Sequence, residues 1–205
     1  MQIGIDLGAT KIESVLLDQN GSEVLRERNN TPKDYKETII SIGNIVKNIE
    51  TKFNKKFSVG ICHPGSTISE TGLIKNSNNS TWMNNKPFLK DISNELNRII
   101  YCENDANCFA LSEATDGSAS HYKIVFGVIL GSGCGGGLVI DKKIVSGSNG
   151  LSGEWGHNPL PYYGNLDDEN INLGKGAFVK NINIATHFYT YLSIRTIKLK
   201  GASDD

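Results

Sequence analysis

The segment DLGAT, residues 6–10, combines residue types that could bind a phosphate. Backbone N–H groups can approach a phosphate closely at a turn of small residues, and an adjacent carboxylate such as Asp6 can hold Mg²⁺ through water. A plain hairpin turn would have the same composition. For this segment alone, the two interpretations are equally supported.

A second glycine-rich turn strengthens the phosphate interpretation. Gly131, Ser132 and Gly133 are followed by three further glycines at residues 135–137. This many glycines indicate a close backbone approach, for which phosphate is a common partner. Neither turn has the GxxxxGK[ST] pattern, and no GxGxxG precedes a helix, so the sequence disfavours P-loop and Rossmann sites.

Asp105 is the candidate for a proton-accepting group. Asn104-Asp105 follows a predicted strand and precedes a predicted helix. A carboxylate at such a junction can face a ligand, and phosphoryl transfer to an alcohol needs a group that accepts the hydroxyl proton. Asp is also among the most frequent helix N-cap residues, and spacing alone favours that capping role.

Two further clusters could contact a polyol. GEWGH, residues 153–157, concentrates a carboxylate, an indole and an imidazole, and NNSTW, residues 78–82, offers amides, hydroxyls and a ring. Such groups can hydrogen-bond or stack on a sugar, and His157 could alternatively ligate zinc. Ordinary surface loops have a similar composition, and a lone loop histidine is more often simply solvated.

The elements that must position these residues follow an α/β pattern. Apolar periodicity and turn residues predict strands at residues 3–5, 12–17, 23–28, 57–61 and 99–103, and helices at 35–53, at about 90–98 and from 106 onward. A loop rich in Asn and Ser spans residues 75–85. From about Tyr162 onward, no regular pattern is predicted.

The opening β-turn-β plan recurs half a chain later. VFGVILGSGCGGGLVIDKK, residues 125–143, repeats the plan of residues 1–21, with an apolar strand, a glycine-bearing turn and a second apolar strand. This repeat predicts two α/β domains of like fold that face each other across a ligand cleft. We expect the first domain at residues 1–120, the beginning of a second at 121–173, and an atypical tail at 174–205.

The composition excludes several classes of function. The net charge is −1, from 21 basic and 22 acidic residues, and neither sign forms a run, so no nucleic-acid or membrane surface is predicted. No apolar stretch approaches the ~20 residues of a membrane span, and the chain opens on a strand-like segment rather than a signal peptide. With its four cysteines scattered, we expect a cytoplasmic protein with reduced thiols.

Taken together, the motifs resemble the ROK family of bacterial sugar kinases. DLGATK, ENDANCFALSEA, LGSGCGGG and GEWGHNPLP occur in that family's order, over roughly residues 1–161. The segments TPKDY, NSTW and GEWGHNPLP look most like fructokinases of the manno-fructokinase type, with the N-acetylglucosamine kinases as near relatives. The resemblance implies an actin-like, hexokinase-like ATPase fold, ATP and Mg²⁺ as cofactors, and a hexose and ATP as the small-molecule partners. The resemblance leaves open whether the protein forms a homodimer.

The resemblance also assigns roles to individual residues. It makes Asp105 the general base on the sugar hydroxyl. The remaining sugar-side residues would be Gly65, Asn79, Asn104, Glu154 and His157. The residues facing ATP would be Asp6, Gly8, Thr10, Lys11, Gly131, Ser132 and Gly133. Family members also bind zinc through the equivalent of His157 and three cysteines of a CxCGxxGC segment.

Three departures from the family pattern stand out. Ala9 replaces the second glycine of DLGGT, which is a modest change if the residue keeps a negative φ. Ser132 replaces a common Thr. No CxCGxxGC follows Pro161, so we expect a truncated second domain, a possible frameshift after about residue 172, and no zinc in this chain.

The sequence therefore predicts an ATP-dependent hexose kinase, with fructose as the favoured sugar and fructose 6-phosphate as the product. Glucose and N-acetylhexosamines are alternative substrates within the same family. A non-catalytic sugar-binding fragment is the alternative from a different class. One such non-catalytic protein would be a ROK repressor. These repressors carry an amino-terminal DNA-binding helix pair, so a repressor is disfavoured for a chain that opens on a strand.

Overall fold

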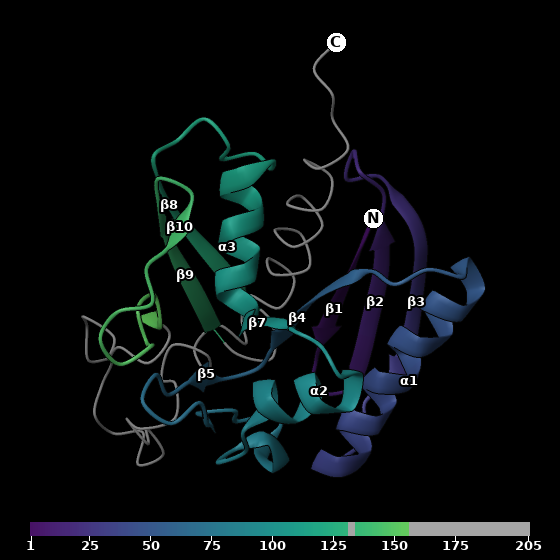
Figure 1. Cartoon of the computed structure of the whole chain (residues 1–205). Coiled ribbons are helices and arrows are strands. Elements are labelled where there is room, and N and C mark those ends of the chain that lie inside the picture. The colour runs from purple at the N-terminus through teal and green to yellow at the C-terminus, as the bar shows by residue number, and fades with distance from the viewer. Residues whose placement is uncertain (131–133, 156–205) are drawn as a thin grey trace. The chain divides into compact units, whose positions relative to one another are not determined.

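The computed structural model describes residues 1–130 and 134–155 (Figure 1). The residue contacts divide the chain into two units, Met1–Asp105 and Ala106–Asp205, and each is described here by itself. The domain bounds inferred from the sequence, after residues 120 and 173, stay a prediction.

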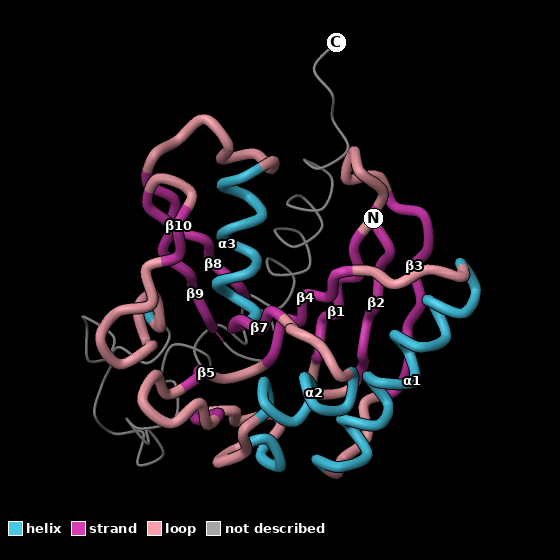
Figure 2. The backbone as a smooth tube through the Cα atoms, viewed as in Figure 1, coloured by secondary structure: helices cyan, strands magenta, loops and turns pink. Residues whose placement is uncertain are grey.

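The first unit is built on a five-stranded sheet with the order β3-β2-β1-β4-β7 (Figure 2). The strands are β1 (Gln2–Leu7), β2 (Lys11–Leu17), β3 (Glu23–Asn30), β4 (Ser58–His63) and β7 (Tyr101–Asn104). The first three pair antiparallel, whereas β1, β4 and β7 are parallel neighbours. The predicted run of three strands near the amino terminus is confirmed.

Two helices pack on this sheet, α1 (Tyr35–Phe53) and α2 (Phe88–Leu96). The Asp34 carboxylate caps α1 by accepting a hydrogen bond from the Glu37 N–H at 3.0 Å, and the predicted bounds of this helix are confirmed. The predicted bounds of α2 were wrong by two residues at each end. The helix begins directly after Pro87 and ends where Asn97 takes a left-handed φ of 50°.

The core of the first unit lies between the helices and one face of the sheet. Alternate strand residues and one side of each helix contribute to it. Its fully buried members include Ile3, Ile5, Ile12, Leu16, Ile42, Val46, Ile49, Val59, Ile61, Phe88 and Ile92. Each such side chain contributes about 1.5–3 kcal/mol of transfer free energy, so this cluster is the main source of the unit's stability. No helix in the described ranges is long and apolar enough to cross a membrane.

Three short elements lie between β4 and α2. They are β5 (Ser66–Thr67), β6 (Ile74–Lys75) and the 3₁₀ helix η1 (Thr81–Met83). The sequence predicted only a loop over most of this region. Elements of two or three residues are too short to show an apolar period, so sequence periodicity could not reveal them.

In the second unit, α3 (Asp105–Thr115) precedes β8 (Ile124–Leu130), β9 (Cys134–Ile140) and β10 (Lys143–Ile144). These strands form an antiparallel sheet in the order β10-β9-β8. The arrangement matches β3-β2-β1 of the first unit, so the predicted repetition of a β-turn-β plan is confirmed.

Glycines allow α3 to lie directly on this second sheet. A Cβ atom at Gly137 would lie 2.6 Å from the Ala106 carbonyl oxygen, and one at Gly127 would lie 2.7 Å from the Ala110 Cβ. Neither position has room for a side chain. Protein contacts alone therefore require a glycine at residue 137, one of the three that the sequence associated with phosphate.

Candidate active site

The candidate residues of the first unit gather at one edge of its sheet. The parallel strands β1, β4 and β7 all end at this edge, which brings together the segments that follow Leu7, His63 and Asn104. Crevices outside the carboxyl ends of parallel strands are frequent ligand sites in α/β proteins. The topology thus explains why residues 6–10, 63–65 and 104–105 lie close together.

Asn104 links two of these segments. Its Nδ2 donates to the Gly65 carbonyl oxygen and to the Asp105 Oδ1, both at 3.0 Å, and the residue is only 7% exposed. Because both of these partners only accept, the orientation of the Asn104 amide is fixed. The amide in turn holds the Asp105 carboxylate, which begins α3.

Both the backbone conformation and the close packing at position 65 require a glycine. Its φ is +79°, and a Cβ atom there would lie 2.5 Å from the Lys75 carbonyl oxygen. Any other residue would be strained by the left-handed backbone and would collide with β6. The predicted sugar-side residues Gly65, Asn104 and Asp105 are therefore neighbours in the structure.

His63, for which the sequence indicated no role, is buried directly behind this edge. Its Nδ1 lies 3.3 Å from the Pro64 carbonyl oxygen and its Nε2 lies 3.4 Å from the Thr67 hydroxyl. The carbonyl can only accept, so Nδ1 donates and Nε2 accepts from Thr67 in the neutral ring. Burial lowers the pKa of His63, against the opposing effects of the Pro64 carbonyl, Glu103 and Asp105.

Asp6 brings a second carboxylate to the same edge. Burial raises the pKa of Asp6, and the neighbouring Asp105 and Glu13 carboxylates raise it further. Glu13 lies opposite Asp6 in the β1–β2 pair and is bound by Arg28 and Arg26, whose hydrogen bonds lower the pKa of Glu13. The electrostatic field at Asp6 therefore favours a cation.

The predicted phosphate-facing turn of residues 8–10 joins β1 to β2. The Gly8 N–H donates to the Lys11 carbonyl oxygen at 2.9 Å, and Thr10 is exposed. Ala9 is not among the residues with positive φ, so the replacement of the family's glycine introduces no backbone strain. The Lys11 ammonium bonds to the Asn30 side chain on β3.

Asn79 lies in an exposed loop that precedes η1. The loop is closed by Asn84, whose Oδ1 accepts from the Ser77 N–H at 2.9 Å and whose Nδ2 donates to the Ser77 carbonyl at 3.3 Å. Sequence reasoning missed Ser77 and Asn84, because an Asn in an Asn-rich loop gives no distinguishing signal. Their side-chain and backbone bonds fix the ends of the segment that carries Asn79.

The second unit contains the predicted Glu154. It follows Gly153, which has a φ of +90° and packs so closely that a Cβ atom would lie 2.6 Å from the Gly136 carbonyl oxygen. The Trp155 indole Nε1 donates to the Gly135 carbonyl oxygen at 2.9 Å. The predicted residues Gly131, Ser132, Gly133 and His157 lie outside the described residues.

Residues 1–130 and 134–155 contain no cluster of three or more His, Cys, Asp or Glu side chains arranged to hold a metal ion. The described free cysteines are Cys62, Cys102 and Cys108. The expectation that this chain binds no zinc stays a prediction, because it depends on His157.

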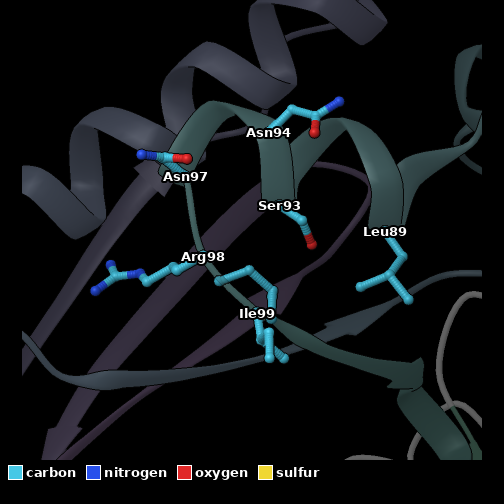
Figure 3. A pocket seen from close by; sticks show the side chains of 7 residues that line it. Leu89, Ser93, Asn94, Asn97, Arg98 and Ile99 are labelled. Carbon is cyan, nitrogen blue, oxygen red and sulfur yellow. The ribbon is translucent and has the colours of Figure 1, made fainter.

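A hollow of about 540 Å³ lies elsewhere on the first unit, at the end of α2 (Figure 3). It is lined by Leu89, Ser93, Asn94, Asn97, Arg98, Ile99 and Ile100. The Arg98 side chain extends away from Leu89 (Figure 3), and its Nη1 donates to Glu50 at 2.6 Å. None of the predicted site residues that the structure describes lines this hollow.

Comparison with protein families and curated proteins gives consistent matches. The model of the ROK family matches residues 2–174. An N-acetyl-D-glucosamine kinase from Histophilus somni (strain 129Pt) is 44% identical over 164 residues, which are 80% of this chain and 53% of that protein. The chain spans about half the length of the curated relatives it matches.

Solved structures share the fold. A ROK family glucokinase from Streptomyces griseus, in complex with glucose and AMPPNP, matches with a TM-score of 0.69 and 26% identity over 78% of this chain and 50% of that one. A ROK family transcriptional regulator, a homolog of the E. coli MLC protein, matches with a TM-score of 0.71 and 17% identity over 92% of this chain and 50% of that one. The latter likeness concerns the fold alone. The predicted actin-like, hexokinase-like α/β fold class is confirmed.

Proposed function

This chain belongs to the ROK family, and we propose that it carries the sugar and phosphate sites of an ATP-dependent hexose kinase. The observation that carries the proposal is the contact of Asn104 with both Gly65 and Asp105 at the carboxyl edge of the first sheet. A carboxylate held in one orientation beside a polar, open edge is suited to accept a proton from a sugar hydroxyl.

In this proposal Asp105 is the general base. Asn104 fixes the Asp105 carboxylate and, with Gly65 and Asn79, forms the sugar side of the site within the first unit. For Glu154 and His157, a role in sugar binding is proposed from the family resemblance alone. Positioning and electrostatic stabilisation would supply most of the rate enhancement, as in other phosphoryl transfers.

The phosphate side would consist of the turn at Gly8 and Thr10, with Lys11 and the second turn at residues 131–133. Mg²⁺ would be held through water by the Asp6 carboxylate, because burial and the neighbouring Asp105 and Glu13 carboxylates raise the pKa of Asp6 and a cation there would relieve the repulsion. Bound Mg²⁺ would neutralise charge on the phosphates of ATP.

For the sugar, we propose N-acetyl-D-glucosamine. The first curated relatives, at 39–44% identity, are all N-acetyl-D-glucosamine kinases. The sequence segments had favoured fructose, and the comparisons do not confirm that choice. The activity of these relatives belongs to proteins about twice the matched length, so it is transferred here as a proposal only.

Calorimetry and a coupled ADP-release assay test the proposal. Binding of N-acetyl-D-glucosamine, fructose and glucose is measured on the 205-residue chain. Transfer from ATP is measured on that chain and on a chimera continued after residue 174 by the second half of the Histophilus somni kinase. We expect N-acetyl-D-glucosamine to bind most tightly and the chimera to phosphorylate it.

Asp105→Asn should lower the transfer rate by ~10²–10⁴-fold and leave sugar affinity nearly unchanged, because the amide keeps the shape but cannot take the proton. Asp116→Asn, at an exposed acid just beyond α3, is the matched control. Absence of sugar binding and transfer from both proteins would overturn the proposed function. Tighter binding of fructose would overturn the choice of sugar, and a normal rate in Asp105→Asn would leave the residue with a structural role.

A further inference from the structure

The segment Thr31–Lys33, just after β3, hydrogen-bonds to the turn between β1 and β2. The Thr31 hydroxyl donates to the Gly8 carbonyl oxygen at 2.8 Å, and the Thr31 N–H donates to the Thr10 carbonyl oxygen at 3.0 Å. Between them, the Lys33 Nζ donates to the Ala9 carbonyl oxygen at 2.5 Å. Successive carbonyl groups of the turn are thus all bound by one segment.

This arrangement determines where the amide hydrogens of the turn point. A peptide group is planar and trans, so its N–H points opposite to its C=O. With the Gly8 and Ala9 carbonyls bound by Thr31 and Lys33, the N–H groups of Ala9 and Thr10 are directed away from that segment. Neither N–H has a hydrogen-bond partner among the described residues. Successive amides that face the same way form a cradle for an anion.

Lys33 is itself held in place. Its ammonium lies 4.8 Å from the centroid of the Trp82 ring, at a distance typical of a cation–π contact. Trp82 belongs to η1, within the loop that Ser77 and Asn84 close around Asn79. One side chain therefore connects the loop proposed for the sugar to the turn proposed for the phosphates.

We infer that Lys33, with Thr31, is a positioning residue for nucleotide binding that orients the Ala9 and Thr10 amides toward the ATP phosphates. The contact of its ammonium with the Trp82 ring holds Lys33 in place. The inference rests on the proposed function for its ligand. It assigns Lys33 no contact with the reacting atoms. Its effect passes through the Ala9 carbonyl, so it should appear in nucleotide affinity and be nearly absent from sugar affinity.

The test compares Lys33→Met, Lys33→Arg and Lys86→Met in the 205-residue chain. Met has an apolar side chain of nearly the same length that can still pack against the Trp82 ring, but it removes the donor and the charge, whereas Arg retains both. Lys86 is a matched control because its ammonium lies over another ring of the same unit, 5.5 Å from the Tyr35 centroid. The probes are AMPPNP with Mg²⁺ and, separately, N-acetyl-D-glucosamine.

We expect Lys33→Met to weaken AMPPNP binding about tenfold, with sugar affinity changed less than twofold, since it removes one hydrogen bond from a charged donor. Lys33→Arg should restore affinity to within about threefold, and Lys86→Met should bind as the wild type does. Wild-type affinity for AMPPNP in Lys33→Met would overturn the inference. Equal weakening of both ligands would also overturn it, because that pattern indicates a general structural defect.

Amide NMR signals of Ala9 and Thr10 supply a second readout that needs no ligand. They should shift in Lys33→Met and remain in place in Lys86→Met. If the wild type binds no AMPPNP, the nucleotide part of the proposed function fails, yet these signals still decide whether Lys33 orients the turn. Unchanged signals in Lys33→Met would overturn that role as well.

Discussion

The β1–β2 and β8–β9 hairpins follow the same plan but are supported by different interactions. The turn of the first is bound by polar contacts of Thr31 and Lys33, whereas its strands contribute to the aliphatic core. The second is held by close packing, since Gly127 and Gly137 lie against Ala106 and Ala110 of α3. A repeated sequence motif therefore does not imply a repeated mode of support.

Individual glycines are also required for different reasons. Gly65 in the first unit has both a positive φ and a close neighbour, whereas Gly137 in the second has only close neighbours. The first unit has a large aliphatic core, and the described part of the second has a small cluster around Ala110, Ala114, Val125 and Val139. We expect substitutions to separate these effects, with the largest loss where conformation and space are both restricted.

Gly65→Ala should cause the largest loss of stability. Left-handed strain and the collision with the Lys75 carbonyl together predict a cost of roughly 2–5 kcal/mol. Gly72→Ala is the matched control, because Gly72 has a φ of +70° but nothing near its Cβ position, so only the strain of about 1–2 kcal/mol applies.

The measurement is urea unfolding followed by tryptophan emission. The chain has two tryptophans, and Trp82 lies in the first unit while Trp155 lies in the second. In a Trp155→Phe background, the emission of Trp82 therefore reports on the first unit. Equal losses of unfolding free energy in Gly65→Ala and Gly72→Ala would show that the Lys75 carbonyl can move to accommodate the added Cβ. Backbone conformation alone would then require a glycine at position 65.

The contrast between hairpins could be only partly predicted from the sequence. The recurrence of Ile39, Ile42, Val46 and Ile49 predicted α1 correctly, because helical periodicity is a local signal. The contacts of Thr31 and Lys33 join residues more than twenty positions apart, and no local pattern encodes them.

The candidate site, too, could be only partly predicted from the sequence. Gly65, Asn104 and Asp105 were assigned to one site through family resemblance, and the structure brings them together. His63 was passed over because a single histidine before Pro-Gly has no distinguishing neighbours in sequence. Its burial results from the packing of Phe88, which lies in a helix formed 25 residues later.

Gly137→Ala should have a smaller effect than Gly65→Ala, and only in the second unit. Its φ is not positive, so the cost is that of overpacking against α3, about 1–3 kcal/mol. Gly135→Ala is the control on the same strand, since its Cβ would lie an ordinary 3.5 Å from the Ala106 Cβ. Trp155 emission in a Trp82→Phe background measures the change. An equal loss detected by Trp82 in the complementary background would show that the units unfold together.

Substitution of His63 should change stability least, and its effect on the free energy of unfolding should depend on pH. Burial disfavours the imidazolium, so the pKa of His63 in the folded unit lies below its ordinary value of 6.5. As pH falls through that value, the unfolded chain binds a proton before the folded chain does, so the free energy of unfolding decreases. The slope can reach but not exceed about 1.4 kcal/mol per pH unit, and it ends once the folded pKa is passed.

His63→Gln should flatten this slope, because the amide can replace the contacts with Pro64 and Thr67 but does not titrate in this range. His121→Gln, at an exposed histidine of the second unit, should leave the slope unchanged. The readout is the Trp82-detected unfolding free energy from pH 8 to pH 5, above the range in which most carboxylates titrate. A slope that persists in His63→Gln would place its origin in another group, with Asp6 first to be examined because its pKa is raised above its ordinary value. A flattened slope would instead establish that the stability of the first unit below neutral pH depends on a neutral, buried His63. In the second hairpin, the described close contacts of Gly127 and Gly137 with Ala106 and Ala110 involve no side chain that titrates.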